Sequence, residues 1–506
     1  MPPQKVNYSV LYVDSKGSLY YELPYQLYAL SEPIDLTENS SHLFVGHSIL
    51  QHAWCEQPFK ILWAVREDGV LLSLTFLKAQ QIAGWARHDT QGYFESVCSV
   101  IEPPVDALYA AVQRFINGNN AYFIERQDNR IWSSIEDVWA VDSALEYSQP
   151  TPNASLSASS GVGLGALTGV TNLVGGRGYS AATTATVVDQ NGSGPGTGAV
   201  VVLTIVAGVI TAVNFPTQGS GYVYPQIVFY DPTNAGSGAS ARAVLNNSMT
   251  FTSSVAVFSP DNIGSVIRSG GGIAVITAVA GSGLQATANI LSPIVDLIPN
   301  SGDSPVVQAA GAWTMTAPVQ TVSGLDHLVG ATVTGLADGN VIPPTVVPAS
   351  GAIVLPVPAS AIIVGLAFTA QIQSVYVDAG EPTVQGQRKK ISAVTARVEA
   401  SQGMTMGANQ PDGSVQSPAL LAPPWGTGNA MSAVPVKSVT PYNALAQPLY
   451  TGDVRIPVEG GYDTRGQVAL QQTQPLPLQV LSFVSEISAG DTPEVKASPK
   501  PQPRGR

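Results

Sequence analysis

Apolar and polar residues alternate along most of the chain in short runs that are separated by tight polar turns. From the start to about residue 127 the pattern predicts four hairpins: Val10–Leu23, Ile61–Leu77, Trp85–Val100 and Leu108–Glu125. Their turns each contain a glycine, which supplies the positive φ that such turns require. Helical periodicity is scarce, so the sequence predicts an all-β protein.

Four hairpins supply eight strands. A propeller blade takes four strands and a ring takes at least four blades, so this segment supplies only about two blades. We therefore predict a partial β-propeller-like platform, which later parts of the chain or another polypeptide would complete. A β-sandwich accounts for the same spacing and stays open as the alternative.

The middle of the chain contains a repeat. Residues 151–164 form a Ser/Ala/Gly tract that predicts a flexible linker and a domain boundary near residue 150. Gly176–Tyr179 then recurs as Gly219–Tyr222, 43 residues later, which predicts two copies of one small β unit. The predicted domains are the platform (1–150), a Gly-rich duplicated β insert (151–260), two β-sandwich or barrel modules (261–380 and 381–490) and a flexible tail (491–506).

Composition narrows the class of protein. Only 11% of residues are charged, against about 25% in ordinary globular domains, and just 10 of the 200 residues in 151–350 carry charge. This predicts that neighbours shield that segment. The net charge of −12 argues against tight binding of nucleic acid, which needs clustered Lys and Arg. The longest apolar stretch, Ala199–Ile210, is too short to span a bilayer, and the N-terminus shows no secretory signal.

The sequence predicts no catalytic residue, no cofactor site and no metal site. Its two cysteines exclude a disulfide framework and a Cys-rich zinc site. The histidines are scattered, and none lies in a metal-binding motif. A Cys/His nucleophile pair is conceivable where His42, His47 and His52 precede Cys55, but a surface loop is the favoured interpretation.

The other candidate motifs also favour structural roles. Gly175–Gly178 is followed by a predicted strand, whereas a phosphate-binding loop needs a helix N-terminus. Neighbouring carboxylates point to opposite faces of a strand, which favours solvated turns over acid–base pairs. The tryptophans of the first third favour packing over a sugar-stacking platform. These interpretations cover His88-Asp89, Glu67-Asp68 and Glu136-Asp137, and Trp54, Trp63, Trp85, Trp132 and Trp139.

Several strings together resemble a known family. They are Ile61–Leu71, Leu74–Lys78, Trp85–Thr90, Tyr122–Arg126, Asp142–Tyr147, Val266–Gly272, Val322–Leu328, Leu336–Gly339, Gly386–Ile391 and Thr451–Arg455. This set is similar to the tail nozzle (tail tubular protein B) family of short-tailed bacteriophages. The resemblance covers most of residues 10–130 and 260–490, and family members are commonly longer at the N-terminus.

The resemblance implies a structural virion protein rather than an enzyme. Nozzle proteins form six-subunit rings through which the genome leaves the capsid. The chain would thus be made in the bacterial cytoplasm and assembled into the virion tail as a homohexamer. Its implied partners are a tail adaptor protein, tail fibres and a separate protein that completes the platform. Viral DNA would pass through the acidic channel without specific binding.

The Gly-rich middle of the chain has a resemblance of its own. Residues 165–250 resemble segments labelled as the first catalytic-cysteine half-domain of ubiquitin-activating enzymes, but they contain no cysteine, so we expect a structural insert. The alternative function is a tail fibre, spike or baseplate-like component for host attachment. A glycan-cleaving spike would show paired carboxylates and a β-helix with many more than two repeats.

Overall fold

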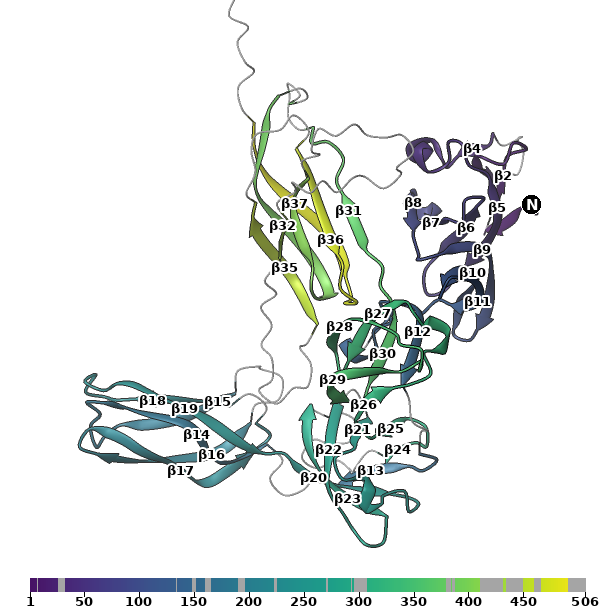
Figure 1. The fold of residues 1–506 in the computed structure, drawn as a ribbon. Coiled ribbons are helices and arrows are strands. Elements are labelled where there is room, and N and C mark those ends of the chain that lie inside the picture. The colour runs from purple at the N-terminus through teal and green to yellow at the C-terminus, as the bar shows by residue number, and fades with distance from the viewer. Residues whose placement is uncertain are drawn as a thin grey trace, which may run out of the picture.

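A computed structural model describes most of the chain as a set of separate β modules (Figure 1). The described residues are 1–6, 8–25, 32–132, 134–147, 152–159, 165–189, 196–222, 225–269, 272–292, 294, 307–378, 384, 387–409, 431–433, 449–458 and 466–489.

Residues 1–126 form the platform, which contains three antiparallel sheets. Within each sheet the strands are neighbours in chain order. The first sheet contains β1 (Gln4–Val6), β2 (Ser9–Val13), β3 (Tyr20–Pro24) and β4 (Ile34–Asp35). The second contains β5 (Ile49–Cys55), β6 (Ile61–Arg66), β7 (Leu71–Leu77) and β8 (Ile82–His88), and the third β9 (Tyr93–Glu102), β10 (Val105–Ile116) and β11 (Asn119–Arg126).

The three sheets stack face to face, with β5–β8 in the middle. Every residue of β6 is buried, because that sheet is covered on both faces. On one face Leu62 and Leu74 pack against Leu11 and Tyr20 of the first sheet. On the other face Trp63 and its neighbours pack against the third sheet, through Val97, Leu108, Ala110 and Val112. Each sheet is an antiparallel meander, and the first two have the four strands that a propeller blade takes.

The platform corrects one predicted hairpin and adds strands. The hairpins at Val10–Leu23, Ile61–Leu77 and Leu108–Glu125 are present as β2–β3, β6–β7 and β10–β11. The predicted Trp85–Val100 hairpin is wrong: β8 pairs with β7 and β9 pairs with β10, so the turn at 90–92 passes from one sheet to the next. Because β1, β4 and β5 are also present, the segment holds three sheets rather than two.

A second module follows the platform. Its main sheet has the order β12–β30–β27–β28, and β26 pairs with β29 beside it. The core contains Val322, Leu328, Val333, Leu355 and Val364, drawn from both sheets. The strands are β12 (Asp142–Tyr147), β26 (Val319–Val322), β27 (Thr332–Ala337), β28 (Asn340–Val346), β29 (Ile353–Ala359) and β30 (Ile362–Leu366).

A third module consists of one seven-stranded sheet that crosses the predicted boundary at 260. Its order is β24–β13–β20–β23–β22–β21–β25, around a core with Phe251, Ile267, Ile276 and Trp313. The strands are β13 (Leu156–Ser159), β20 (Ser248–Ser253), β21 (Val266–Ser269), β22 (Gly272–Val279), β23 (Gln285–Ser292), β24 (Val307–Gln308) and β25 (Trp313–Thr316).

The boundary at 260 is therefore wrong, because β13 and β20 share a sheet with β21–β25. The flexible linker predicted at 151–164 is corrected in part. Leu156 and Ala158 of β13 are buried, while residues 151 and 160–164 lie outside the described residues. The boundary at 150 also separates β12 from its partner β30. Small apolar residues in this tract pack in a core, which their composition did not distinguish from a linker.

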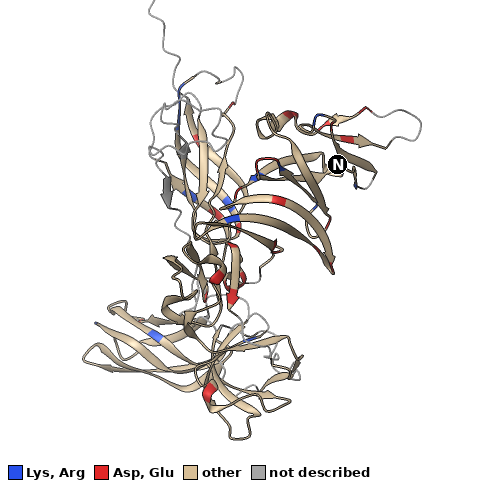
Figure 2. Ribbon diagram, turned by 45° about the vertical axis from the view of Figure 1, so that its right-hand side comes forward, with Lys and Arg blue, Asp and Glu red and all other residues tan. Residues whose placement is uncertain are grey.

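The insert spans residues 165–246 and lies in the chain between β13 and β20 of the third module. The pairs β14–β19, β15–β18 and β16–β17 build a nearly closed barrel. Figure 2 shows this projecting module with few charged residues. Its strands are β14 (Ala166–Arg177), β15 (Thr184–Asp189), β16 (Thr197–Val206), β17 (Val209–Ser220), β18 (Pro225–Tyr230) and β19 (Ser237–Asn246).

The two copies of the repeat exchange equivalent contacts inside the insert. The hydroxyl of Tyr179 accepts a hydrogen bond from the Ala239 N–H (3.0 Å), and that of Tyr222 accepts one from the Ala199 N–H (3.3 Å). Gly176 and Gly219 have φ of +61° and +65°, and each lies against the backbone of the other copy. The repeat seen in the sequence is thus a structural duplication.

The C-terminal module contains two sheets around a core with Val394, Met406, Ile456 and Leu470. One sheet has the order β31–β36–β33–β34 and the other β35–β32–β37. The strands are β31 (Ala370–Gln373), β32 (Lys389–Ser401), β33 (Thr405–Asn409), β34 (Met431–Ala433), β35 (Tyr450–Pro457), β36 (Gln467–Gln472) and β37 (Gln479–Ala489). Because β31 pairs with β36, this module begins before the predicted boundary at 381. The predicted tail, 491–506, lies outside the described residues.

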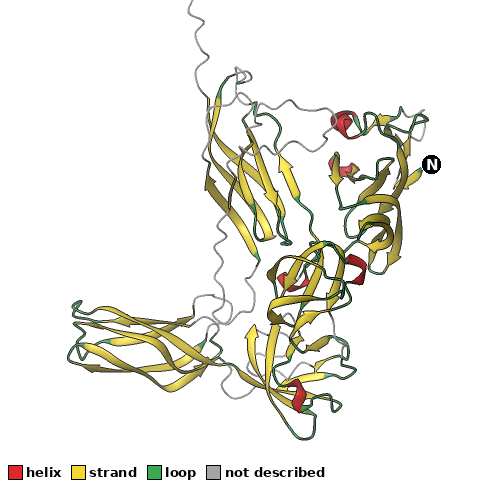
Figure 3. Ribbon diagram, viewed as in Figure 1, coloured by secondary structure: helices red, strands yellow, loops and turns green. Residues whose placement is uncertain are grey.

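Strands dominate every module, and the helices drawn in Figure 3 are short 3-10 turns. These are η1 (Glu38–Leu43), η2 (Lys78–Gln80), η3 (Ile135–Asp137), η4 (Pro260–Asn262) and η5 (Asp326–Leu328). The predicted all-β, multidomain class is confirmed. Across the described ranges, no helix has both the length and the apolar character needed to cross a bilayer.

Candidate functional site: platform end faces and module joints

The structure does not assemble the Cys/His pair. The Cys55 thiol donates to Ser99 Oγ (3.4 Å), and burial raises the pKa of Cys55, which keeps it a protonated, weak nucleophile at neutral pH. His52 contacts the Tyr20 hydroxyl (2.6 Å) and the Pro2 carbonyl (2.9 Å) instead, and His47 lies 3.6 Å from Asp68. His42 lies in the last turn of η1. Cys55 and these histidines therefore contact structural neighbours rather than one another.

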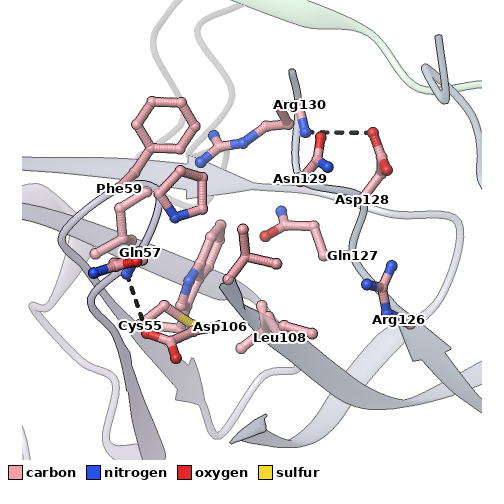
Figure 4. Close-up of a pocket in the computed structure, with 15 residues that line it drawn as sticks. Cys55, Gln57, Phe59, Asp106, Leu108, Arg126, Gln127, Asp128, Asn129 and Arg130 are labelled. Carbon is pink, nitrogen blue, oxygen red and sulfur yellow. Dashed lines mark hydrogen bonds between the residues drawn. The ribbon is translucent and has the colours of Figure 1, made fainter. Parts of the chain in front are cut away.

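The small cavity beside Cys55 is lined by the residues drawn in Figure 4. Its volume is about 30 Å³, room for about two water molecules. The Arg130 guanidinium lies 5.1 Å from the centre of the Phe59 ring, a cation–π contact at the protein surface. A space of this size holds no substrate.

His88 does not lie in a surface turn as predicted. It is the last residue of β8, where its Nε2 lies 2.7 Å from Ser73 Oγ and its ring packs on Trp63. Burial lowers the pKa of His88 to about 4, so the imidazole is neutral at physiological pH. His88 is a packing residue of the platform.

The glycine-rich segment and the tryptophans also have structural roles. Gly175–Gly178 ends β14, and a strand rather than a helix follows it. Trp54, Trp63 and Trp85 belong to the two platform cores, while Trp132 packs with η3 and its Nε1 donates to Asp128 (3.2 Å). Within the described ranges no cluster of three or more His, Cys, Asp or Glu could hold a metal ion.

A buried ionic network joins the platform to the second module. Arg114 on β10 has no exposed side-chain surface, and its guanidinium donates to both carboxylate oxygens of Glu125 (2.7 Å each). It also donates to Thr90 Oγ1 (2.8 Å), and Thr90 in turn donates to Asp142 Oδ2 of β12 (2.6 Å). These bonds hold the sheet-to-sheet turn of the platform against the first strand of the next module.

The Asp142 carboxyl in this network predicts a measurable pH dependence. Burial raises the pKa of Asp142, so its contribution to stability is fully present below the ordinary pKa of 3.8 and is lost as pH rises through the raised value. Asp142→Asn keeps an acceptor for Thr90 but does not titrate. We expect this variant to gain stability relative to wild type as pH rises from about 4 to 7. Urea unfolding across that range measures the difference, and a constant difference would contradict it.

A second ionic joint connects three segments. Arg268 on β21 donates to Glu136 Oε2 of η3 (2.6 Å), and to Asp338 Oδ1 and Ser360 Oγ of the second module (2.9 Å each). The Ser360 and Ala361 N–H groups also donate to Asp338. One cation therefore ties the third module to the second and to the connector between platform and second module. Sequence reasoning treated Glu136 as a solvated turn charge, whereas it is buried.

The outer face of the third platform sheet is uncovered and apolar. We call Tyr93, Phe115, Tyr122 and Ile124 the trailing face, and their exposed fractions are 58, 71, 67 and 75%. Their alternate neighbours, including Val112 and Arg114, point inward. A sheet with one solvated face normally presents polar residues there, so large apolar side chains mark a contact surface.

The other end of the stack is also uncovered. We call Val10, Tyr12, Tyr21 and Leu23 the leading face. Val10 lies opposite Leu23, and the rings of Tyr12 and Tyr21 stack at 5.8 Å. Two further tyrosines lie at its edge, where the Tyr25 N–H donates to the Tyr8 carbonyl (2.8 Å). Leu23, Tyr8 and Tyr25 are exposed there, whereas Val10, Tyr12 and Tyr21 are half-buried, and Lys5 and Asp35 lie opposite Val10 and Tyr21. Each end of the stack thus exposes some aromatic and aliphatic side chains.

A groove of about 490 Å³ lies where the trailing face meets the second module. Tyr93, Gln113 and Phe115 line it from the platform, and Ala331 and Leu366 from the second module. Arg114 also borders the groove, but Glu125 neutralises it. The groove is large enough to take a protruding side chain.

Comparison with known proteins adds no relative. No protein-family model matches the chain, and no curated protein matches it. The function proposed below therefore depends on the end faces and joints of this chain and on the resemblance of its short sequence strings.

Proposed function

We propose that this chain is the nozzle subunit of a short-tailed bacteriophage tail, a structural virion protein that closes into a six-subunit ring for genome ejection. The observation that carries the proposal is the stack of blade-like sheets with an apolar face exposed at each end. Two different contact faces on one chain generate head-to-tail association, which closes into a ring when the rotation per subunit permits.

The net negative charge of the chain supports a role as a channel for DNA. Six copies with a net charge of −12 each would carry −72, and an acidic wall would let DNA slide without sticking. In this role the protein is not an enzyme, and DNA is its passing cargo. A tail adaptor and tail fibres would be its neighbours in the virion.

The ionic joints support the proposal because they fix neighbouring modules relative to one another. Arg268 ties segments of different modules directly, and Arg114 does so through Thr90, which donates to Asp142 of the second module. Such charge-assisted hydrogen bonds are stronger than neutral ones. A ring under a pressurised capsid needs modules whose relative positions are fixed.

Mass photometry and negative-stain microscopy of the purified 52.6 kDa chain test this function. The expected particle is a six-fold ring with an open axis. The same measurement with the protein encoded by the adjacent gene tests whether a separate chain completes the platform. A trimeric rod in both samples would overturn the nozzle proposal and favour the fibre or spike alternative.

A further inference from the structure

The two end faces of the platform carry the same classes of residue that fill the gaps between its sheets. Inside the stack, aromatic and aliphatic side chains from both sheets meet, as Tyr20 and Leu11 meet Leu74. The trailing face adds Phe115, Tyr122 and Ile124 at the outward positions of β10 and β11, and the leading face adds tyrosines and Leu23. Each end face therefore resembles one side of the packed boundary between two sheets, without the sheet that would cover it.

We propose that the trailing face of one copy packs against the leading face of the next copy. The stack of sheets then continues across the subunit boundary. This inference rests on the proposed ring and assigns its contact. The partner is a second copy because each chain carries both halves of such a gap, at opposite ends of one stack. A symmetric dimer would cover only one of the two faces and leave the other exposed.

The groove beside the trailing face supplies an anchor point. Tyr8 and Tyr25 protrude at the edge of the leading face, with exposed fractions of 81 and 66%. In the packed pair one of these rings enters the groove against Phe115 and Leu366, where Asn120 offers a hydrogen bond to its hydroxyl. Tyrosines that fill pockets within well-packed interfaces commonly carry a large share of the binding energy.

The rim of the trailing face is polar and already paired. Arg126 donates to Glu102 (2.7 Å), and the Tyr109 hydroxyl donates to the same carboxylate (2.5 Å). These paired groups therefore bring no unpaired charge of their own to the contact. Apolar centres with polar rims are typical of protein interfaces.

Two double variants test the contact by complementation. Phe115→Glu/Ile124→Glu places charges on the trailing face, and Tyr8→Glu/Leu23→Glu places them on the leading face. All four residues are exposed, so we expect both variants to fold. Each variant alone should run at the single-chain mass of 52.6 kDa. An equimolar mixture should form dimers of one chain of each kind, joined through the one intact pair of faces, and no ring.

The matched control is Val375→Glu/Val484→Glu, which changes equally exposed valines near and within the C-terminal module and should leave the ring intact. Rings that persist in either platform variant overturn this inference while the nozzle proposal stands. A wild-type trimeric rod overturns the nozzle proposal, and a wild-type chain that stays monomeric with and without the adjacent-gene protein overturns both.

Cys98 offers a second readout, because it is exposed on the outer side of β9, opposite Tyr109. In a Leu23→Cys variant, a bismaleimide should link Cys98 of one copy to residue 23 of the next and give a ladder of oligomers. Cross-linked dimers of the wild-type chain, which has no second exposed cysteine among its residues, would indicate trailing-to-trailing contact and overturn the inference. Protection of Cys98 only by the adjacent-gene protein would also overturn it.

Discussion

Replacing Arg268 by Met is expected to lower the free energy of unfolding by about 3–5 kcal/mol. The side chains of Arg268, Glu136 and Asp338 are 18, 5 and 15% exposed, so removal of the cation leaves two carboxylates that water solvates poorly. Met keeps much of the aliphatic volume, so the loss reflects charge rather than a cavity. Urea unfolding followed by tryptophan fluorescence, to which Trp313 beside β21 contributes, measures it.

The Arg268→Met result has a matched control and a pH signature. Arg397→Met breaks a solvent-exposed ion pair with Asp453 and should leave the transition unchanged. Burial already raises the pKa of Glu136, and without Arg268 that carboxyl takes up a proton more readily. The difference in the free energy of unfolding between wild type and Arg268→Met should therefore decrease as pH falls. Equal transitions for the two variants would show that the joint does not hold the modules together.

Gly176→Ala is expected to destabilise the insert by about 3 kcal/mol or more. A Cβ at this position would lie 2.4 Å from the Ser237 carbonyl oxygen and 2.6 Å from the Ala239 nitrogen. The backbone of β19 cannot yield without breaking its pairing with β14. The φ of +61° adds strain for any side chain.

The duplication supplies a replicate of this experiment. Gly219→Ala meets the Thr197 carbonyl oxygen at 2.6 Å and the Ala199 nitrogen at 2.7 Å, so it should have an effect of similar size. Gly238→Ala isolates the contribution of backbone strain, because Gly238 lies in the same insert with φ +78°, and the nearest atom to its Cβ position is 3.9 Å away. Hydrogen exchange of insert amides should increase much more in the first two variants than in this one. A Gly238→Ala effect as large as theirs would contradict the backbone clash.

Local patterns predicted the parts of this fold that depend on neighbours in the chain. Alternation and turn glycines were sufficient for β2–β3, β6–β7 and β10–β11, because a tight hairpin is specified by its own residues. The repeat predicted the duplicated insert, since equivalent glycines and tyrosines impose the same turn twice.

Tertiary structure decided the pairings and contacts between distant residues. Whether β9 returns to β8 or starts a new sheet depends on which faces pack, and both outcomes share one sequence pattern. The same holds for β13, whose small residues are equally consistent with a linker. It is a core strand because β20, about 90 residues later in the chain, pairs with it. Long-range pairing is chosen by the burial it achieves, which no local window contains.

Alternation, the repeat and the composition were enough to predict that this chain is built of strands, that one segment is duplicated and that charge is sparse through its middle. Packing between distant segments makes Arg114 and Arg268 buried joints and leaves Phe115, Tyr122 and Ile124 exposed. An alternating strand shows which residues share a face, because side chains alternate with period two. Which of its two faces another sheet covers is a property of the packed modules.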